Sequence, residues 1–457
     1  MVSGNQALAT AATTAAVNGV ERGQAGANNA RRLRVLILCT TLLASGLAIW
    51  GLTLLGGYAL QKNQAQKLSV LPSWEKILGE KAWRQGSSVQ SLTGIRYDPR
   101  RNLLVATLLH YFRDAEKRHG SEVVIEILDA LTGTTLSTIV CENKYNYSRS
   151  LVVLGDQWPQ GWFATTLEEE NLVLLVNGLS LRTFDMTTGA LQAELDLPQR
   201  EAHWIAVALP GVRKVFLFDP VRKIKGVKNN LVEWELDFDL FEVQAGRNSI
   251  GLKKITSFRS IEYPSLARLY ICTTCQREKL IWLQFEDGSE FFNVYDPIRN
   301  QFEDPPRKRP PHVVRMMSNN PFLEELPTLW LDEHNSRWLH IRRESKSKES
   351  TRGYVQLEVW PHQGDKPLLS LRIPGVEDLL PKFSFDSSGT LAAVFEDNTT
   401  YLIDVNRSRI ATKRVDKEEG LQLDAGLLWP DGSSVFRFLR GKNRVKVKAY
   451  KIVPADK

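Results

Sequence analysis

Cysteine and histidine are scarce in this chain of 457 residues, which contains four cysteines and seven histidines. Four cysteines are too few for the disulfide framework of a small secreted domain. The sequence also lacks an HExxH segment, a P-loop, a GxGxxG segment and a GxSxG elbow, which are common motifs for zinc hydrolysis, nucleotide binding and serine catalysis. We therefore predict no catalytic residue, no metal site and no cofactor, and we favour a non-enzymatic function.

The chain has a single CxxC segment, Cys272-Thr-Thr-Cys275. A structural zinc site needs four ligands, and neither a second cysteine pair nor a suitably spaced histidine pair accompanies this one. Redox motifs of this kind normally open a helix, whereas this segment begins in the strand-like run RLYICTT, which contains Cys272 and ends just before Cys275. We therefore predict two ordinary cysteines at the end of a strand.

Charged residues are absent from a long apolar segment, Val35 to Gln61. Because about 20 apolar residues cross a bilayer as a helix, this segment predicts one transmembrane helix over 35–61. Residues 1–34 are mostly small and polar, and they predict a disordered tail. Three arginines precede the span directly, and the positive-inside rule then predicts a cytoplasmic N-terminus and a C-terminal domain on the exoplasmic side. These topology determinants are Arg31, Arg32 and Arg34.

Two alternatives remain open for the apolar segment. Gly57-Tyr58-Ala59 places small residues where a signal peptidase cleaves, but the segment is longer than a typical signal sequence, so we favour an uncleaved signal-anchor. Ala44 and Ala48 form a small-xxx-small pair, through which two copies of the helix could approach and form a homodimer.

The composition and the hydrophobic pattern of the sequence change after this segment. Residues 62–93 predict a connector, with a short helix that Ser73 caps and Gly79 ends. From Gly94 onward, short runs rich in Val, Ile, Leu, Phe, Tyr and Trp alternate with Gly, Asp, Asn and Pro, while long helical periods are absent. This pattern predicts an all-β domain over 94–457.

One unit recurs in this domain, and its clearest copy is Lys382–Val415. A first strand leads to the turn Asp386-Ser387-Ser388-Gly389, a hairpin follows at Asp397-Asn398, and a third strand ends at Ile403-Asp404. Asp and Asn side chains hydrogen-bond the local backbone in such turns, and Gly supplies positive φ. The stretch resembles a blade of the WD40-like or quinoprotein-like β-propellers, although the Gly-His and Trp-Asp pairs that name the WD40 family are missing.

Six further stretches are looser copies of this unit: Gly94–Val140, Trp158–Leu197, Trp204–Gln244, Leu266–Glu303, Pro327–Ile373 and Leu421–Val453. A spacing of roughly 35 to 50 residues is typical of propeller repeats. We therefore predict an all-β fold, a β-propeller of about seven four-stranded blades preceded by one transmembrane α-helix. Two stacked β-sandwiches are the alternative, which the recurring Asp–Thr–Gly turn disfavours.

Basic residues concentrate in four short stretches, 222–228, 305–311, 342–352 and 440–448. Loop charges normally serve to keep a protein surface hydrated, but such a patch can also bind an anionic partner. The proline-flanked stretch is the strongest candidate, and it places the possible patch at Arg307, Lys308 and Arg309. A formal net charge of +7 on the whole chain is too mild to indicate nucleic acid binding, so we predict no nucleic acid partner.

These features predict a membrane-anchored β-propeller that acts as a protein-interaction or scaffold module at a membrane surface. Its partners would be the lipid bilayer, through 35–61, and an unidentified protein. The alternative is an enzyme or a small-ligand-binding protein that uses the central channel of the propeller. That alternative requires polar residues with perturbed pKa values to converge at one mouth of the channel.

Overall fold

The chain divides into two compact units, Met1–Gln66 and Lys67–Lys457, and the residues described here all belong to the second. The computed structural model describes residues 68–82, 87–113, 119–142, 152–153, 162–167, 171–177, 180–198, 204–228, 231–258, 269–284, 291–308, 328–345, 353–364, 366–373, 382–396, 398–416 and 420–455. No helix in these ranges is long and apolar enough to cross a membrane. The predicted tail 1–34 and the predicted span 35–61 lie outside the described residues, so both stay predictions.

The described strands form seven antiparallel four-stranded units, which we call blades 1 to 7 and whose strands we call a to d. Blades 1 to 3 contain β2 (Ser87–Asp98), β3 (Leu103–Arg113), β4 (His119–Asp129) and β5 (Thr135–Glu142); β7 (Phe163–Thr166), β8 (Leu172–Val176), β9 (Ser180–Asp185) and β10 (Leu191–Asp196); and β11 (Ile205–Leu209), β12 (Lys214–Lys228), β13 (Leu231–Ala245) and β14 (Ile250–Phe258).

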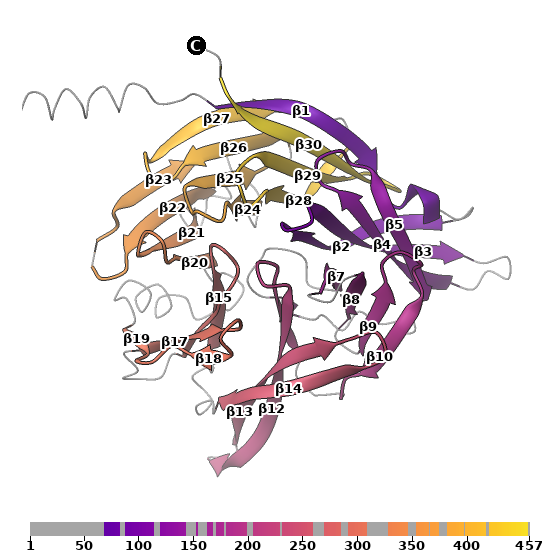
Figure 1. The fold of residues 1–457 in the computed structure, drawn as a ribbon. Helices are drawn as coiled ribbons and strands as arrows, with labels where there is room; N and C mark the ends of the chain where they lie inside the picture. Colours follow the sequence, from indigo (N-terminus) through magenta and orange to yellow (C-terminus); the bar gives the residue numbers. More distant parts are fainter. Residues whose placement is uncertain are drawn as a thin grey trace, which may run out of the picture. The chain divides into compact units, whose positions relative to one another are not determined.

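Blades 4 to 6 contain β15 (Leu269–Thr274), β16 (Leu280–Gln284), β17 (Phe291–Asp296) and β18 (Gln301–Phe302); β20 (Thr328–Asp332), β21 (Arg337–Ser345), β22 (Gly353–Pro361) and β23 (Leu369–Ile373); and β24 (Lys382–Phe385), β25 (Leu391–Phe395), β26 (Thr399–Asp404) and β27 (Arg409–Val415). Blade 7 contains β28 (Gln422–Leu428), β29 (Ser434–Arg440), β30 (Val445–Pro454) and, as its strand d, β1 (Leu68–Ile77). Two short strands, β6 (Val152–Val153) and β19 (Arg307–Lys308), pair with β11 and β17. Figure 1 shows the blades following one another in sequence order around a ring.

The first strand of the described chain closes this ring. β1 pairs antiparallel with β30, so that Leu68 lies opposite Pro454 and Ile77 opposite Lys446. Pro72 is tolerated because β1 is an outermost strand, where one row of backbone groups needs no partner. The predicted connector 62–93 therefore holds β1 and the start of β2. The helix predicted from Ser73 is wrong, because pairing with β30 overrides its local helix signals.

Apolar side chains hold neighbouring blades together. Among the described residues, seven hydrophobic clusters are present, and each lies between two successive blades, including blades 7 and 1. At the closing interface, the rings of Tyr97 and Trp429 lie 5.8 Å apart. Burial of apolar area is the main favourable term in folding, and each blade gains it only from its neighbours. The predicted propeller of four-stranded sheets is confirmed, whereas two separate sandwiches would not share clusters around a ring.

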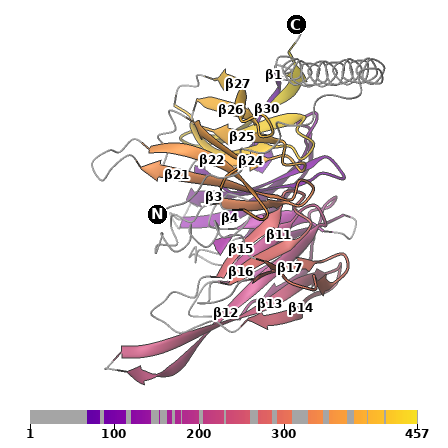
Figure 2. The ribbon, with the colours of Figure 1, turned by 90° about the vertical axis from the view of Figure 1, so that its left-hand side faces the viewer.

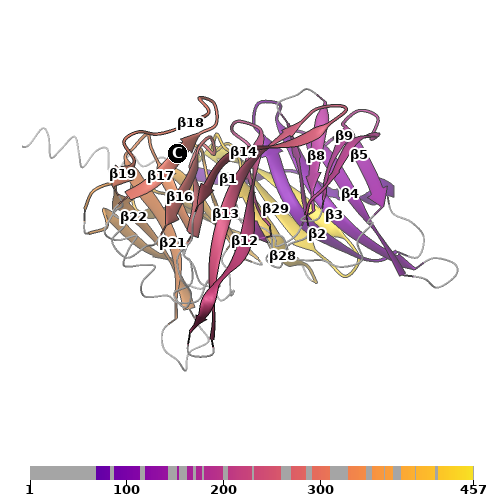
Figure 3. The ribbon, with the colours of Figure 1, turned by 90° about the horizontal axis from the view of Figure 1, so that it is seen from below.

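The predicted repeat boundaries differ in accuracy from blade to blade. The clearest copy, Lys382–Val415, begins and ends with β24 and β27. The copy Trp204–Gln244 omitted β14. In that blade, β12 and β13 remain paired as far as Lys228 and Leu231, while β11 reaches only to Phe218 of β12. Figures 2 and 3 show the resulting hairpin extending beyond the other blades.

Removal of β1 tests whether its pairing with β30 closes the ring. A chain that begins at residue 78 is expected to unfold at a lower denaturant concentration than one that begins at residue 62, since blade 7 loses its strand d. We expect a loss on the order of 5 kcal/mol in the free energy of unfolding, from several backbone hydrogen bonds at about 1 kcal/mol each. Chemical denaturation followed by circular dichroism measures this difference. A chain beginning at residue 68 is the control and should match the longer one; equal stability for all three chains would contradict the closure.

Candidate functional site

The two rims of the ring are built from different connections. Because the strands of a blade alternate in direction, the a–b and c–d turns lie at one rim, which we call the turn rim. The b–c and d–a connections lie at the other, which we call the loop rim. Leu68 lies at the turn rim, since it opposes Pro454 at the end of strand c. The described chain therefore enters and leaves the ring on the turn rim.

Aspartates and left-handed residues shape the turn rim. In four c–d turns, an aspartate ends strand c and its Oδ1 accepts backbone N–H groups two or three residues later, at 2.8–3.1 Å. The fourth residue after each aspartate has φ between 53° and 73°. This is the recurring Asp-containing turn of the sequence, and its local hydrogen bonds fix the backbone. The aspartates are Asp129, Asp185, Asp296 and Asp404, and the left-handed residues are Gly133, Gly189, Asn300 and Ser408.

The a–b turns of blades 1, 3 and 4 meet at this rim. Arg100 Nη2 of blade 1 donates to the carbonyl oxygen of Gly211 in blade 3 at 3.4 Å, and the N–H of Gly211 donates to the carbonyl oxygen of Arg277 in blade 4 at 3.2 Å. A Cβ atom on Gly211 would lie only 2.5 Å from the carbonyl oxygen of Gln276. Only glycine therefore permits this approach of two turns.

Asp98 stands at the centre of this meeting point and is fully buried. Its Oδ1 accepts the backbone N–H groups of Arg100 and Arg101 at 3.0 and 3.3 Å, and its Oδ2 accepts the hydroxyl of Thr166 from blade 2 at 3.0 Å. The Nε atom of Arg101 lies 3.7 Å from Oδ2, and Nη1 of Arg213 lies 4.0 Å from it. The carboxylate thus draws two guanidinium groups close while the turn and Thr166 supply its hydrogen bonds.

A further guanidinium belongs to Arg277, which is buried. Its Nη1 donates to the carbonyl oxygen of Cys275 at 3.1 Å, and its Cζ lies 5.5 Å from the centre of the Tyr97 ring, next to Asp98. We call Arg100, Arg101, Arg213 and Arg277 the arginine cluster. Such an arrangement is suited chemically to holding an anionic group, because planar N–H forks match oxyanions.

Arg337, between blades 5 and 6, has all its hydrogen-bond partners within the chain. Arg337 Nε donates to Oδ2 of the buried Asp332 at 2.7 Å, while its Nη1 and Nη2 donate to Asn406 Oδ1 at 2.7 Å and to the carbonyl oxygen of Gly389 at 2.9 Å. Asn335 Nδ2 donates to the same Asp332 oxygen at 2.8 Å. Every arm of this guanidinium has a partner within the chain, so Arg337 holds blades 5 and 6 together.

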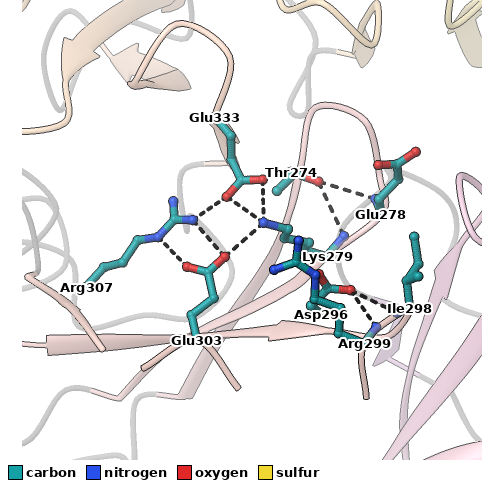
Figure 4. A network of polar contacts seen from close by, with 9 residues as sticks. All are labelled: Thr274, Glu278, Lys279, Asp296, Ile298, Arg299, Glu303, Arg307 and Glu333. Atoms are coloured by element: carbon teal, nitrogen blue, oxygen red, sulfur yellow. Dashed lines mark hydrogen bonds and ion pairs between the residues drawn. The ribbon is translucent and has the colours of Figure 1, made fainter. Parts of the chain in front are cut away.

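Arg307, which the sequence predicts as part of an anionic-partner patch, takes part in a ring of four charges (Figure 4). Its Nε lies 2.6 Å from Oε2 of Glu303, and its Nη2 donates to both Glu303 and Glu333. Lys279 Nζ lies 2.9 Å from Glu303 and 3.0 Å from Glu333. Two cations and two carboxylates thus balance one another between blades 4 and 5.

The pKa values of Glu303 and Lys279 reflect the balance of charge among these four side chains. Burial raises the pKa of Glu303, but hydrogen bonds from Lys279 and the charge of Arg307 outweigh it, so the net pKa is below its usual range. Burial lowers the pKa of Lys279, and the hydrogen bonds to Glu303 and Glu333 outweigh that effect and raise it. Glu303 and Lys279 are therefore both held in their charged forms.

Two of the predicted patch residues, Arg307 and Lys308, are neighbours in β19. β19 is extended, so Arg307 and Lys308 point to opposite faces, and Lys308 is exposed. Arg309 lies outside the described residues, as do the topology determinants Arg31, Arg32 and Arg34. The anionic-partner patch at 307–309 stays a prediction.

Toward the loop rim, Lys382 is the first residue of strand a in blade 6 and Asp424 is the third residue of strand a in blade 7, and both are buried. Lys382 Nζ donates to the carbonyl oxygen of Leu423, and Arg440 Nε lies 3.3 Å from Oδ1 of Asp424. Burial raises the pKa of Asp424, and the charges of Arg440 and Lys382 oppose that rise. Three of the basic stretches, 222–228, 342–352 and 440–448, lie at or next to b–c connections, so the topology places them toward this rim. Arg307 of the fourth stretch contacts Glu333, which follows strand a of blade 5 on the turn rim.

The CxxC cysteines are free thiols and are buried, as expected for ordinary core residues. Burial raises the pKa of Cys272 and Cys275 far above the usual thiol range. Because the thiolate is the reactive form, neither thiol is activated. Among the described residues, no group of three or more His, Cys, Asp and Glu side chains could hold a metal ion.

The arginine cluster escaped the sequence analysis. Its members belong to three blades, and only Arg100 and Arg101 are neighbours in the sequence. One signal exists: Arg213 and Arg277 occupy left-handed backbone positions, with φ of 54° and 55°, in a–b turns where the other blades have Asn, Ser or Gly. A large side chain at such a position suggests a function for that side chain.

The charge ring gives a pH-dependent prediction. The folded pKa of Glu303 is below the unfolded value of 4.5, so its contribution to stability is present above pH 4.5 and is lost as the pH falls through the folded value. Replacing Glu303 by Gln should reduce the free energy of unfolding by about 1 kcal/mol at pH 7 and by less at pH 3. Urea unfolding at both pH values measures this, with the exposed Glu80→Gln as control. An equal loss at the two pH values would contradict the ion-pair role.

Comparison with known proteins supplies one structural likeness. No protein-family model matches the chain, and no curated protein matches it. Among solved structures, the chain is similar to the β-propeller domain of Cps50 (Swd1) from Myceliophteria thermophila, with 11% sequence identity and a TM-score of 0.40. The match covers 84% of this chain and 100% of that domain. The fold assignment rests on the blades and their shared clusters, and on these grounds the second unit is a β-propeller.

Proposed function

We propose that this chain is a single-pass membrane protein whose β-propeller is a protein-interaction module at a membrane surface. The observation that carries the proposal is the closure of the ring by β1. Leu68 follows the predicted span 35–61 after a connector of only residues 62–67. Because β1 is an integral strand of blade 7, an anchor in that span would be joined by a short tether to the whole ring rather than to a loose segment.

The ring offers a rigid surface to a protein partner. Each blade interface has its own apolar cluster, and local hydrogen bonds fix the turns. Little conformational entropy is then lost on binding, which favours a propeller as a docking platform. The hairpin of β12 and β13 and the basic stretches 222–228, 342–352 and 440–448 give the loop rim features that a partner can recognise. The arginine asymmetry around the span supports a cytoplasmic N-terminus with the propeller on the exoplasmic side.

Ligand binding at the channel is the second candidate, and one observation favours it. Asp424, Lys382 and Arg440 bring opposite charges together at the loop rim, where strands a begin, and the pKa of Asp424 is raised by its burial. Such perturbed groups are enriched at binding sites.

Co-purification after crosslinking in the native membrane tests the first candidate. The full chain should retain protein partners that a chain ending at residue 67 loses, because the ring supplies the contacts. A chain lacking 35–61 should fold with the same β-sheet circular dichroism and leave the membrane fraction. Replacing 222–237 by a two-residue turn separates binding by the hairpin from binding by the ring. An identical set of proteins recovered with the chain ending at 67 would contradict the proposal.

Protease treatment of intact cells tests the orientation. A tag after Lys457 should be digested while a cytoplasmic marker survives, because the predicted topology exposes the propeller outside. Survival of both the tag and the marker in intact cells, with loss of both after lysis, would contradict the orientation.

A further inference from the structure

We propose that the arginine cluster at the turn rim binds an oxyanion of the phosphate class. The inference rests on geometry at Asp98 and is independent of the proposed interaction function. Four guanidinium groups, those of Arg100, Arg101, Arg213 and Arg277, gather where three a–b turns meet around one carboxylate.

Asp98 leaves much of this positive charge available. Its two oxygens are occupied by two backbone N–H groups and the Thr166 hydroxyl. The guanidinium atoms of Arg101 and Arg213 stay at 3.7 and 4.0 Å, beyond hydrogen-bonding distance. The carboxylate orients the two arginines through charge without using their N–H donors.

Two of these donors have no hydrogen-bond partner within the described part of the chain. Nη2 of Arg101 and Nε of Arg213 are both buried from solvent. Buried polar groups are nearly always hydrogen-bonded in folded proteins, so such a pair indicates that something else supplies the acceptors. Arg337 on the same rim provides the internal contrast, because Asp332, Asn406 and Gly389 accept from all three of its nitrogens.

The chemistry of the donors selects the ligand. Guanidinium forks bind oxyanions in a bidentate manner, and a phosphate has enough oxygens to accept from two forks at once. The two unpartnered nitrogens come from the turns of different blades, so one anion between them would also link blades 1 and 3. The phosphate could be free in solution or part of a lipid headgroup, and both sources share this chemistry.

Equilibrium dialysis of the full chain in neutral detergent with labelled inorganic phosphate tests the site. We expect saturable binding of one phosphate, weakened about tenfold in Arg101→Gln and in Arg213→Gln, since each loses a charged hydrogen bond. Arg101→Lys keeps the charge without the fork and should bind with intermediate affinity. Arg299→Gln is the matched control. Arg299 is exposed on the same rim in a c–d turn, and its replacement removes the same charge. Circular dichroism confirms that each variant is folded.

Flotation with vesicles distinguishes the two sources, and it uses the chain lacking 35–61, because the predicted span would carry the full chain into any vesicle. Binding to phosphatidylglycerol vesicles but not to phosphatidylcholine vesicles, lost in Arg213→Gln and kept in Arg299→Gln, would assign a headgroup; phosphate binding without flotation would assign a free anion. Phosphate binding that does not saturate, or that falls equally in Arg299→Gln, would overturn the proposal. A further outcome would also overturn it: phosphate binding seen only when Gln replaces Glu168, Glu169 and Glu170, which follow strand a of blade 2. In that case the arginines would bind the chain's own carboxylates.

Discussion

Pairing between β1 and β30 is the constraint on which the rest of this structure depends. It joins the two ends of the described chain in one sheet and gives blade 7 its fourth strand. It also completes the circle of apolar contacts, because the cluster between blades 7 and 1 combines Tyr97 and Leu104 with Trp429 and Phe436. In an open array of blades these two faces would meet water, and the free edge of β30 would be available for unwanted pairing.

The sequence is informative wherever a blade is built from neighbouring residues. The copy at Lys382–Val415 was predicted to the residue because its turns depend on local chemistry, such as the bonds that Asp386 accepts from Thr390 and Leu391. β1 could not be found in this way. Ser73 and Gly79 have the local chemistry of helix ends, and only a partner at the far end of the chain makes their segment a strand. β14 was missed similarly, since its register depends on β13.

Charged residues also differ in how far the sequence predicts them, according to whether their partners are local or distant in the chain. Three consecutive cations at 307–309 predict a patch from sequence alone, and the sequence does not show that the extended backbone turns Arg307 and Lys308 to opposite faces or that two glutamates pair with Arg307. The arginine cluster shows the converse, because residues far apart in the sequence become neighbours only when three turns meet. Local reasoning predicts which turns exist, whereas the meeting of turns depends on the order and curvature of the blades. Charge clusters on a propeller rim are therefore properties of the ring.

The opposition of Leu68 and Pro454 has a consequence for the connectivity of the chain. Because both ends of the ring leave neighbouring strands on the same rim, a short linker could join them, and the ring could be opened at another c–d turn. In such a circular permutant, a different blade would be completed by the first strand of the chain. The position at which the chain enters the ring is thus separable from the architecture of the blades.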